Sequence, residues 1–335
     1  MRLNHIRIEQ FGKVQIPVVD LSPVLKGDAE ATRTLAKSVA SVCRDFGFLY
    51  VENHGIDSEF LDKAQHIIEK FFQLSDEEKL QIHISKSAYH RGYFPNGEEN
   101  ALGSPVKDIK EAFDMALELS PDDPCVVAGK PFHGPNAWPD ALPEFKTIML
   151  ELYEKWRLMC SRISKVFALA LELPEDYFVD KTNKPMAQMR AAFYPNQRPT
   201  EVKDAVGCGA HTDYGIVSAI WQIDVPGLQI ETLAGEWIDA PRIPGTFVCP
   251  LGDMIEHWTN GFWKATNHRV INISGEARHS AAFFFDPNYD CIIAPLSQFV
   301  SDKTPAAYEP ITMGEHVRRG FDGTFNYRTT QPHGA

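Results

Sequence analysis

Two histidines and one aspartate have the residue types and spacing of a metal site. His211 and Asp213 are two residues apart, so on a β-strand both side chains would point to the same face. His268 leads into a later strand-like run and adds a second imidazole. Two imidazoles and one carboxylate can bind one face of an octahedral divalent ion and leave three positions open. These three residues are the candidate metal ligands and the candidate catalytic centre.

Arg278 and Ser280 repeat the two-residue spacing on the next strand-like run. They would present a guanidinium fork and a hydroxyl, which suit the far carboxylate of a co-substrate that chelates the metal. The donor set suits Fe(II), although it would also bind zinc. Zinc-dependent hydrolysis is therefore a chemical rival, but it would not need this arginine and serine. Together the five residues predict a reaction at iron.

The composition is that of an ordinary globular protein. The 335 residues are 44% hydrophobic and 23% charged, with a formal net charge of −12. This negative charge argues against nucleic acid or an anionic membrane as a partner, because both favour clustered Lys and Arg. No apolar run approaches the roughly 18 residues of a membrane span, and the N-terminus turns polar too early for a secretory signal. The six cysteines form no CxxC pair, which predicts reduced thiols and a cytoplasmic location.

Helices come first in the chain and strands follow. Apolar residues at helical spacing predict three helices, at 28–45, 58–74 and 143–173. Short strands are expected at 16–21 and 46–51, and loops with short strands at 89–135. Residues 186–295 contain short apolar runs separated by turn signals, a pattern typical of a β-sandwich or jelly roll. A last helix is expected at 312–319.

We therefore expect a mixed α/β protein with a mainly β core flanked by helices. Its four consecutive segments would form one compact unit. They are an N-terminal region of helices and strands (1–140), a long connecting helix (141–180), the catalytic β core (181–300), and a C-terminal helix and tail (301–335).

Along nearly its whole length the chain resembles the Fe(II)/2-oxoglutarate-dependent dioxygenases of the isopenicillin N synthase-like family. The N-terminal region shares the runs 16–21 and 46–56 with that family. The core shares a series of motifs in the family's order: His211-Thr212-Asp213, Gly252-Asp253, Asn260-Gly261, Lys264, Thr266, His268-Arg269-Val270 and Arg278-His279-Ser280. The resemblance implies a double-stranded β-helix, or distorted jelly roll, with the active site inside its mouth. It also implies Fe(II) as the metal and 2-oxoglutarate and dioxygen as co-substrates.

The resemblance assigns a role to each of the five candidate residues. His211, Asp213 and His268 would bind iron. Arg278 and Ser280 would bind the C5 carboxylate of 2-oxoglutarate, whose C1 carboxylate and keto oxygen chelate the metal.

Further residues follow from the same resemblance. Residues 190–195 align with the family's R-x-N-x-Y-P run, so Tyr194 would supply a hydroxyl to the co-substrate. The Asn of that run is Ala192 here, which removes one polar contact to the co-substrate. The family counterpart of Tyr89, His90, Arg91 and Tyr93 lies near the substrate opening, so these residues are expected to meet the substrate. Independently of the resemblance, one ring of the run that follows the Arg/Ser pair is expected to face the pocket, and Phe285 is the candidate.

The implied activity couples oxidative decarboxylation of 2-oxoglutarate, to succinate and CO2, with hydroxylation of a C–H bond in a small molecule. Other outcomes stay open at the same iron site, namely desaturation, ring closure and ethylene formation. An oxidase that needs no 2-oxoglutarate and a catalytically silent metal- or metabolite-binding protein are also open. The residues leave the substrate and the oligomeric state undetermined.

Overall fold

The core of the protein is built from two β-sheets. The computed structural model describes residues 2–3, 5–100, 108–196, 206–272 and 274–329. Within these residues the larger sheet has ten strands, in the order β1-β2-β3-β4-β12-β9-β14-β7-β6-β5, and the smaller has four, in the order β11-β10-β13-β8. The larger sheet comprises β1 (Arg2–Leu3), β2 (Ile6–Phe11), β3 (Val14–Asp20), β4 (Phe48–Glu52), β5 (Gly92–Phe94), β6 (Glu111–Ala116), β7 (Gln188–Tyr194), β9 (Val217–Gln222), β12 (Phe247–Pro250) and β14 (Arg278–Phe285). The smaller sheet comprises β8 (Cys208–His211), β10 (Leu228–Glu231), β11 (Trp237–Asp239) and β13 (His268–Val270), and a separate pair is formed by β15 (Ile292–Ile293) and β16 (Ile311–Thr312).

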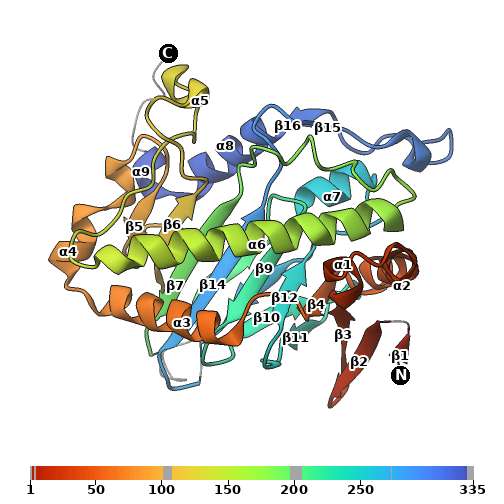
Figure 1. The fold of residues 1–335 in the computed structure, drawn as a ribbon, viewed down its shortest axis with the longest axis horizontal. Helices are drawn as coiled ribbons and strands as arrows, with labels where there is room; N and C mark the ends of the chain where they lie inside the picture. The colour runs from red at the N-terminus through yellow and green to blue at the C-terminus, as the bar shows by residue number, and fades with distance from the viewer. Residues whose placement is uncertain (1, 4, 101–107, 197–205, 273, 330–335) are drawn as a thin grey trace.

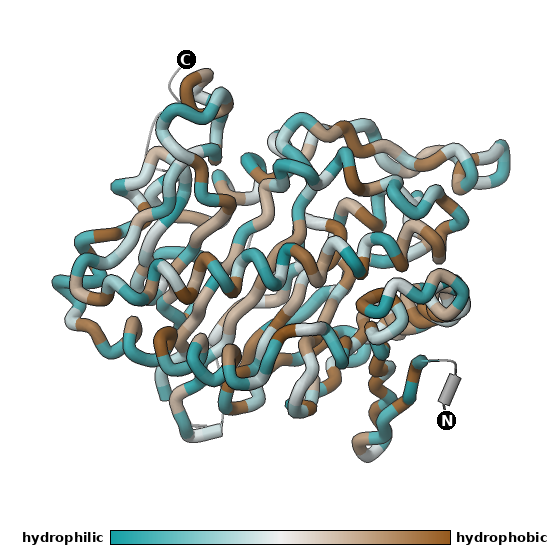
Figure 2. Tube along the Cα trace, viewed as in Figure 1, coloured by the Kyte–Doolittle hydropathy of each residue, from teal (hydrophilic) through white to brown (hydrophobic). Residues whose placement is uncertain are grey.

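Helices cover one face of the larger sheet. In Figure 1 the long helix α6 (Pro143–Ala170) runs across this sheet, with α3 (Ser58–Gln73) alongside it. The other helices are α1 (Ser22–Leu25), α2 (Ala29–Phe46), α4 (Asp76–Gln81), α5 (Pro124–Val127), α7 (Asp253–Trp258), α8 (Met313–Thr324) and α9 (Asn326–Thr329). Hydrophobic and hydrophilic residues alternate along α6 in Figure 2, as expected for a helix with one face on the sheet. No helix in the described part of the chain has both the length and the hydrophobicity needed to cross a bilayer.

Aromatic rings fill the space between α6 and the sheet. Tyr153 packs edge-on against Phe283 of β14, with ring centroids 5.1 Å apart. Trp156 packs against Phe247 of β12 at 5.6 Å. Each such buried side chain contributes about 1.5–3 kcal/mol of hydrophobic stabilisation. The opposite face of β14 is thereby left for the interior between the sheets.

The main helices agree with the sequence-based predictions, but several boundaries and some of the strands differ. Phe46 belongs to α2 and not to the following strand, because Gly47 ends the helix with a left-handed φ of +77°. The strand β2, which pairs with β3, was missed by the sequence reasoning. Helix α8 continues to Thr324, five residues beyond its predicted end. The mainly β core flanked by helices is confirmed.

Strands from the N-terminal half border the larger sheet's central strands on both sides. β4 pairs with β12 on one side, and β6 pairs with β7 on the other. The strands between these two junctions are β12, β9, β14 and β7, and β14 carries Arg278 and Ser280. Residues far apart in the sequence therefore form a single sheet around the site.

Candidate metal centre and cavity

The structure brings His211, Asp213 and His268 together. The potential ligand atoms of the three side chains all lie within 4.8 Å of one another. His211 Nε2 is 3.6 Å from Asp213 Oδ1, and His268 Nε2 is 3.6 Å from Asp213 Oδ2. The two histidines are direct partners in the antiparallel pairing of β8 with β13. Strand pairing thus sets the spacing of the imidazoles, which a single strand could not do.

Backbone carbonyls hold both imidazoles in one orientation. His211 Nδ1 lies 2.8 Å from the Gly209 carbonyl oxygen, and His268 Nδ1 lies 3.0 Å from that of Thr266. A carbonyl can only accept, so each Nδ1 carries the proton and each Nε2 keeps its lone pair free. Burial lowers the pKa of His268, although the charge of Asp213 opposes this shift. Two neutral imidazoles with free Nε2 atoms are suited to bind a metal.

The prediction that Asp213 lies on the same strand as His211 was wrong. β8 ends at His211, and Asp213 lies in the irregular segment that follows. The carbonyl of Asp213 accepts a hydrogen bond of 2.7 Å from the N–H of Asp253, the first residue of α7, instead of from a neighbouring strand. A Cβ at Gly252 would lie 3.0 Å from that same carbonyl oxygen and 2.3 Å from that of Gly215. This close approach of two backbone segments carries the carboxylate to the imidazoles.

Arg278 and Ser280 share one face of β14, as their spacing predicts. Opposite them in the register stand Tyr194 and Ala192 of β7. Arg278 is completely buried, and its Nε donates to the carbonyl of Val225 at 3.1 Å. Neither Nη1 nor Nη2 has a hydrogen-bond partner among the described residues. Burial lowers the pKa of Arg278, and the neighbouring Tyr194 and Asp224 compensate only part of this effect.

Tyr194 lies directly beneath this guanidinium. The Arg278 Cζ is 4.9 Å from the centre of the Tyr194 ring, and burial raises the pKa of the phenol. Ala192 is buried opposite Ser280, at the position where the R-x-N-x-Y-P run would place an amide. The Arg278 guanidinium, the Ser280 hydroxyl and the Tyr194 ring therefore lie together as expected. The methyl group of Ala192 stands in place of that amide.

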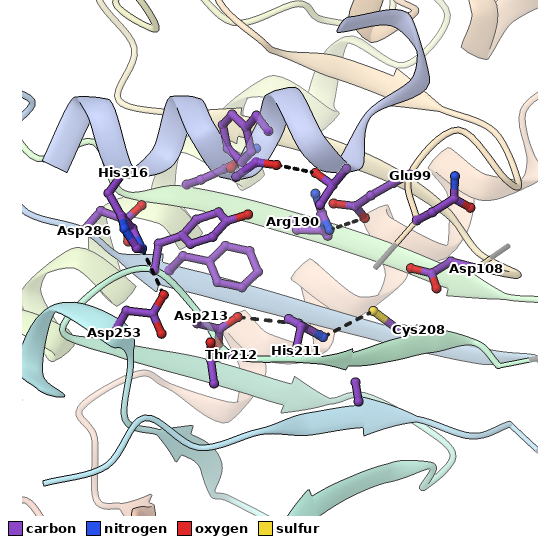
Figure 3. Close-up of a pocket in the computed structure, with 18 of the residues that line it drawn as sticks. Glu99, Asp108, Arg190, Cys208, His211, Thr212, Asp213, Asp253, Asp286 and His316 are labelled. Atoms are coloured by element: carbon purple, nitrogen blue, oxygen red, sulfur yellow. Dashed lines mark hydrogen bonds and ion pairs between the residues drawn. The ribbon is translucent and has the colours of Figure 1, made fainter. Parts of the chain in front are cut away.

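A cavity of about 690 Å³ opens beside the triad. His211 and Asp213 line it, and so do Gln188 and Arg190 of β7 and Phe284 of β14. The C-terminal helix α8 forms another wall, with the lining residues His316, Arg319, Gly320, Phe321 and Thr324. In Figure 3 the labelled side chains from the strands and from α8 surround the space above His211 and Asp213.

One side of this cavity carries a buried network of ion pairs that sequence reasoning missed. Arg190 binds Asp114 through two hydrogen bonds of 2.7 and 2.8 Å, and its Nη1 is 2.7 Å from Glu99 Oε2. Lys110 Nζ is 2.8 Å from both Glu99 and Asp108. A signal existed, since Asp108, Lys110 and Asp114 are separated by even numbers of residues and so share the inner face of β6 and the residues before it.

Acidic residues gather at another part of the cavity. Asp286 and Asp253 both line it, and Asp253 Oδ2 is 2.9 Å from His316 Nε2. Figure 3 shows these three side chains near one another, with Asp213 between them and His211. Asp286 was also missed, although it continues the alternation of Arg278, Ser280 and the two inward residues that follow, Ala282 and Phe284.

The five residues expected near the substrate lie outside the lining of this cavity, as far as the described residues define it. Phe285 is fully buried on the opposite face of β14, and Phe284 lines the cavity in its place. Tyr93 also faces the helices, because it packs on Phe71 and donates a 2.6 Å hydrogen bond to Glu111. The alternation of side chains along a strand accounts for both corrections.

Tyr89, His90 and Arg91 form the structure behind α8 instead of the cavity surface. The Tyr89 ring occupies the space over Gly134, where a Cβ would approach it to 2.3 Å. His90 stacks on Phe321 with ring centroids 4.1 Å apart, and its burial holds its pKa well below the usual range. Arg91 donates to three backbone carbonyls, those of residues 89, 90 and 132. These three residues therefore support a wall of the cavity from outside.

The donor set fits Fe(II) together with 2-oxoglutarate. Asp213 Oδ2 is a buried atom with no hydrogen-bond partner among the described residues, and it faces His268 Nε2, while Oδ1 faces His211 Nε2. Two nitrogens and one carboxylate oxygen on one side of an ion leave room for a chelating co-substrate. The unpartnered Nη1 and Nη2 of Arg278 match the two oxygens of a carboxylate.

Comparison with known proteins agrees with this chemistry. Residues 16–141 match the model for the N-terminal region of non-haem dioxygenases in morphine synthesis, and residues 185–287 match that of the 2OG-Fe(II) oxygenase superfamily. A homoarginine-6-hydroxylase of Oryza sativa subsp. japonica is 36% identical over 315 residues, covering 90% of this chain and 95% of its own. A 2-oxoglutarate-Fe(II) type oxidoreductase of Aspergillus fumigatus is 31% identical over 312 residues, covering 92% and 93%.

Solved structures agree as well. A full-length protein of Neurospora crassa, crystallised with alpha-KG (2-oxoglutarate) and thymine, superposes with a TM-score of 0.80 at 27% identity. The match covers 93% of this chain and 98% of that one. The expected jelly-roll fold and the expected use of Fe(II) and 2-oxoglutarate are thereby confirmed. The chain belongs to the Fe(II)- and 2-oxoglutarate-dependent oxygenases of the isopenicillin N synthase-like superfamily.

Proposed function

We propose that His211, Asp213 and His268 hold the iron, and that Arg278 and Ser280 hold the C5 carboxylate of 2-oxoglutarate. On this proposal the enzyme hydroxylates a small molecule that binds in the adjoining cavity. The observation that carries the proposal is the convergence of three ligand atoms within 4.8 Å beside a buried guanidinium with two unpartnered nitrogens. When bound, Fe(II), 2-oxoglutarate and dioxygen supply the oxidant that converts a C–H bond to an alcohol, and 2-oxoglutarate leaves as succinate and CO2.

The protein's own part is to position the reactants and to exclude water. The Gly209 and Thr266 carbonyls keep both histidines in the tautomer that offers Nε2. Arg278 fixes the far end of the co-substrate, and Tyr194 supports the guanidinium from below. Phe284 and Phe321 give the cavity apolar surface near the metal ligands, which limits the access of water to them.

A small molecule fits the size of the space. A cavity of about 690 Å³ lies within the range of about 300–1,000 Å³ that is usual for small-molecule sites. Homoarginine is the first substrate to test, because similar proteins from rice, soybean and Arabidopsis thaliana are named homoarginine-6-hydroxylases. Mass spectrometry of the product separates hydroxylation from desaturation and ring closure, and headspace gas analysis detects ethylene.

The metal assignment is tested with alanine variants of two ligands. His211→Ala and Asp213→Ala are expected to lose stoichiometric Fe(II) binding and succinate formation. His66→Ala, on the exposed side of α3, is the matched control and should keep both. Coupled succinate formation by Asp213→Ala at the wild-type rate would contradict the proposed role.

We also propose a cytoplasmic location without nucleic-acid or membrane partners. The six cysteines are unpaired thiols, and the net charge is −12. A fluorescent fusion tests the location, and the ratio of absorbance at 260 and 280 nm of the purified protein tests for bound nucleic acid.

A further inference from the structure

The carboxylate of Asp286 has an oxygen in the cavity region without a hydrogen-bond partner in the part of the chain that the structure describes. Asp286 lies directly after β14, is 4% exposed and lines the cavity. Its Oδ1 is buried and has no hydrogen-bond partner among the described residues. A buried polar atom without a partner is costly unless something binds to it, so its presence in a cavity indicates a ligand group.

The basic residues around the cavity are already engaged elsewhere. Arg190 is paired with Asp114 and Glu99, and Lys110 with Glu99 and Asp108. Arg319 pairs with Glu315 on the exposed side of α8. Each cation thus has a carboxylate partner of its own, and none of the described ion pairs involves Asp286.

The charged groups that act on the pKa of Asp286 are themselves acidic. Burial is the main cause that raises the pKa of the Asp286 carboxyl well above its usual range, and the negative charges of Asp213 and Asp253 add to the shift. The carboxylate of Asp253 is oriented by His316, with 2.9 Å between Oδ2 and Nε2. Iron on Asp213 would compensate the charge of that residue, which leaves Asp286 and Asp253 as the acidic side chains of this part of the cavity.

Iron and 2-oxoglutarate would not compensate Asp286. The two positive charges of Fe(II) and the one of Arg278 equal the three negative charges of Asp213 and 2-oxoglutarate. The loaded centre is then formally neutral. A positive charge on a further molecule in the cavity would therefore stabilise the ionised form of Asp286.

We propose that Asp286 binds a positively charged end group of the substrate, an ammonium or a guanidinium. The assignment rests on the proposed function, since the substrate is the molecule that enters this cavity beside the iron. Asp253 lines the same cavity and offers a second acceptor, and Phe284 and Phe321 offer apolar surface to an aliphatic stem. Gly215 is part of the same arrangement, because a Cβ there would lie 2.4 Å from Asp286 Oδ1.

The test compares probes that have a cationic side chain with probes whose side chain is uncharged, so that the α-amino and carboxylate groups are the same within each pair. Calorimetry is done without oxygen on protein loaded with Fe(II) and 2-oxoglutarate. The pairs are L-homoarginine with L-homocitrulline, L-arginine with L-citrulline, and L-lysine with L-norleucine. At least one cation is expected to bind about tenfold or more tightly than its neutral partner. The arginine and lysine pairs distinguish a guanidinium from an ammonium.

Substitution of the carboxylate tests the residue. Asp286→Asn keeps the shape and should weaken binding of the preferred cation by about 30-fold or more, so that its advantage over the neutral probe disappears. Asp290→Asn is the matched control from the same segment, because Asp290 is exposed and pairs with Lys130. This control should keep the wild-type preference for the cation.

Two failures are distinguishable. If Fe(II) and 2-oxoglutarate do not bind to the wild-type protein, the proposed function is wrong and this inference falls with it. If both bind but no cation exceeds its neutral partner, or if the preference survives in Asp286→Asn, only the role of Asp286 is overturned. The wild-type comparison alone decides the matter if the Asp286→Asn protein does not fold.

Discussion

Replacing Arg278 with lysine separates the charge of the guanidinium from its geometry. Arginine offers a carboxylate two parallel N–H donors, and Nη1 and Nη2 both lack partners in the described protein. Lysine keeps the charge but loses one of these two hydrogen bonds. A hydrogen bond to a charged group contributes about 1.5–3 kcal/mol. Arg278→Lys is therefore expected to weaken 2-oxoglutarate binding by about 10- to 150-fold.

The same numbers predict a change in ligand-induced stabilisation. At a 2-oxoglutarate concentration of about 100 times the wild-type Kd, the free energy of unfolding rises by about 2.7 kcal/mol in the wild type. At that concentration Arg278→Lys should gain only about 0.3–1.4 kcal/mol. Urea unfolding under nitrogen, with and without 2-oxoglutarate and with Fe(II) throughout, measures both gains.

A matched control comes from the strand that carries His268. Arg269 binds Gln229 and stacks on Trp237 at 4.1 Å, so it belongs to the smaller sheet and does not line the cavity. Arg269→Lys should keep the wild-type affinity for 2-oxoglutarate. A Kd for Arg278→Lys within about twofold of the wild-type value would refute the assignment of the clamp.

Three further changes test other features of the structure. Asp114→Asn leaves Arg190, which is 13% exposed, with Glu99 as its remaining carboxylate partner and should lower the free energy of unfolding in urea by about 1–3 kcal/mol. Gly215→Ala would place a Cβ 2.4 Å from Asp286 Oδ1, so it should cost about 1–3 kcal/mol in the same assay and weaken binding of a cationic substrate. Burial lowers the pKa of His54 to about 4, so His54 favours the folded state above pH 6.5 and this contribution is lost as the pH falls towards 4. Between these values the wild type should lose about 1.4 kcal/mol per pH unit more than His54→Gln does, and equal slopes would contradict the assignment.

Local periodicity explains what could be predicted from the sequence. Arg278 and Ser280 share a face because alternation along a strand is fixed by the backbone. The same alternation, counted onward from Ser280, predicts that Phe284 and not Phe285 faces the cavity. The large helices also follow from spacing alone, and their ends follow where a residue such as Gly47 ends them.

Features that depend on how distant elements pack could not be predicted. Asp213 leaves the strand because an N–H of α7 binds its carbonyl, and nothing near Asp213 in the sequence signals that contact. His316 meets Asp253 only because α8 lies against the cavity. Such contacts join residues far apart in the chain and have no periodic pattern.

The position of the N-terminal strands has a consequence for how the protein is made. β4 pairs with β12, and β6 pairs with β7. Because β4 and β6 come earlier in the chain, they leave the ribosome well before these partners. Until the partners are synthesised, the nascent chain exposes the hydrogen-bonding edges of β4 and β6. A fragment that ends near residue 141 should therefore aggregate, although a family model matches residues 16–141 as a unit. Exchange of residues 16–141 between related proteins would therefore have to keep β4 matched to β12 and β6 matched to β7.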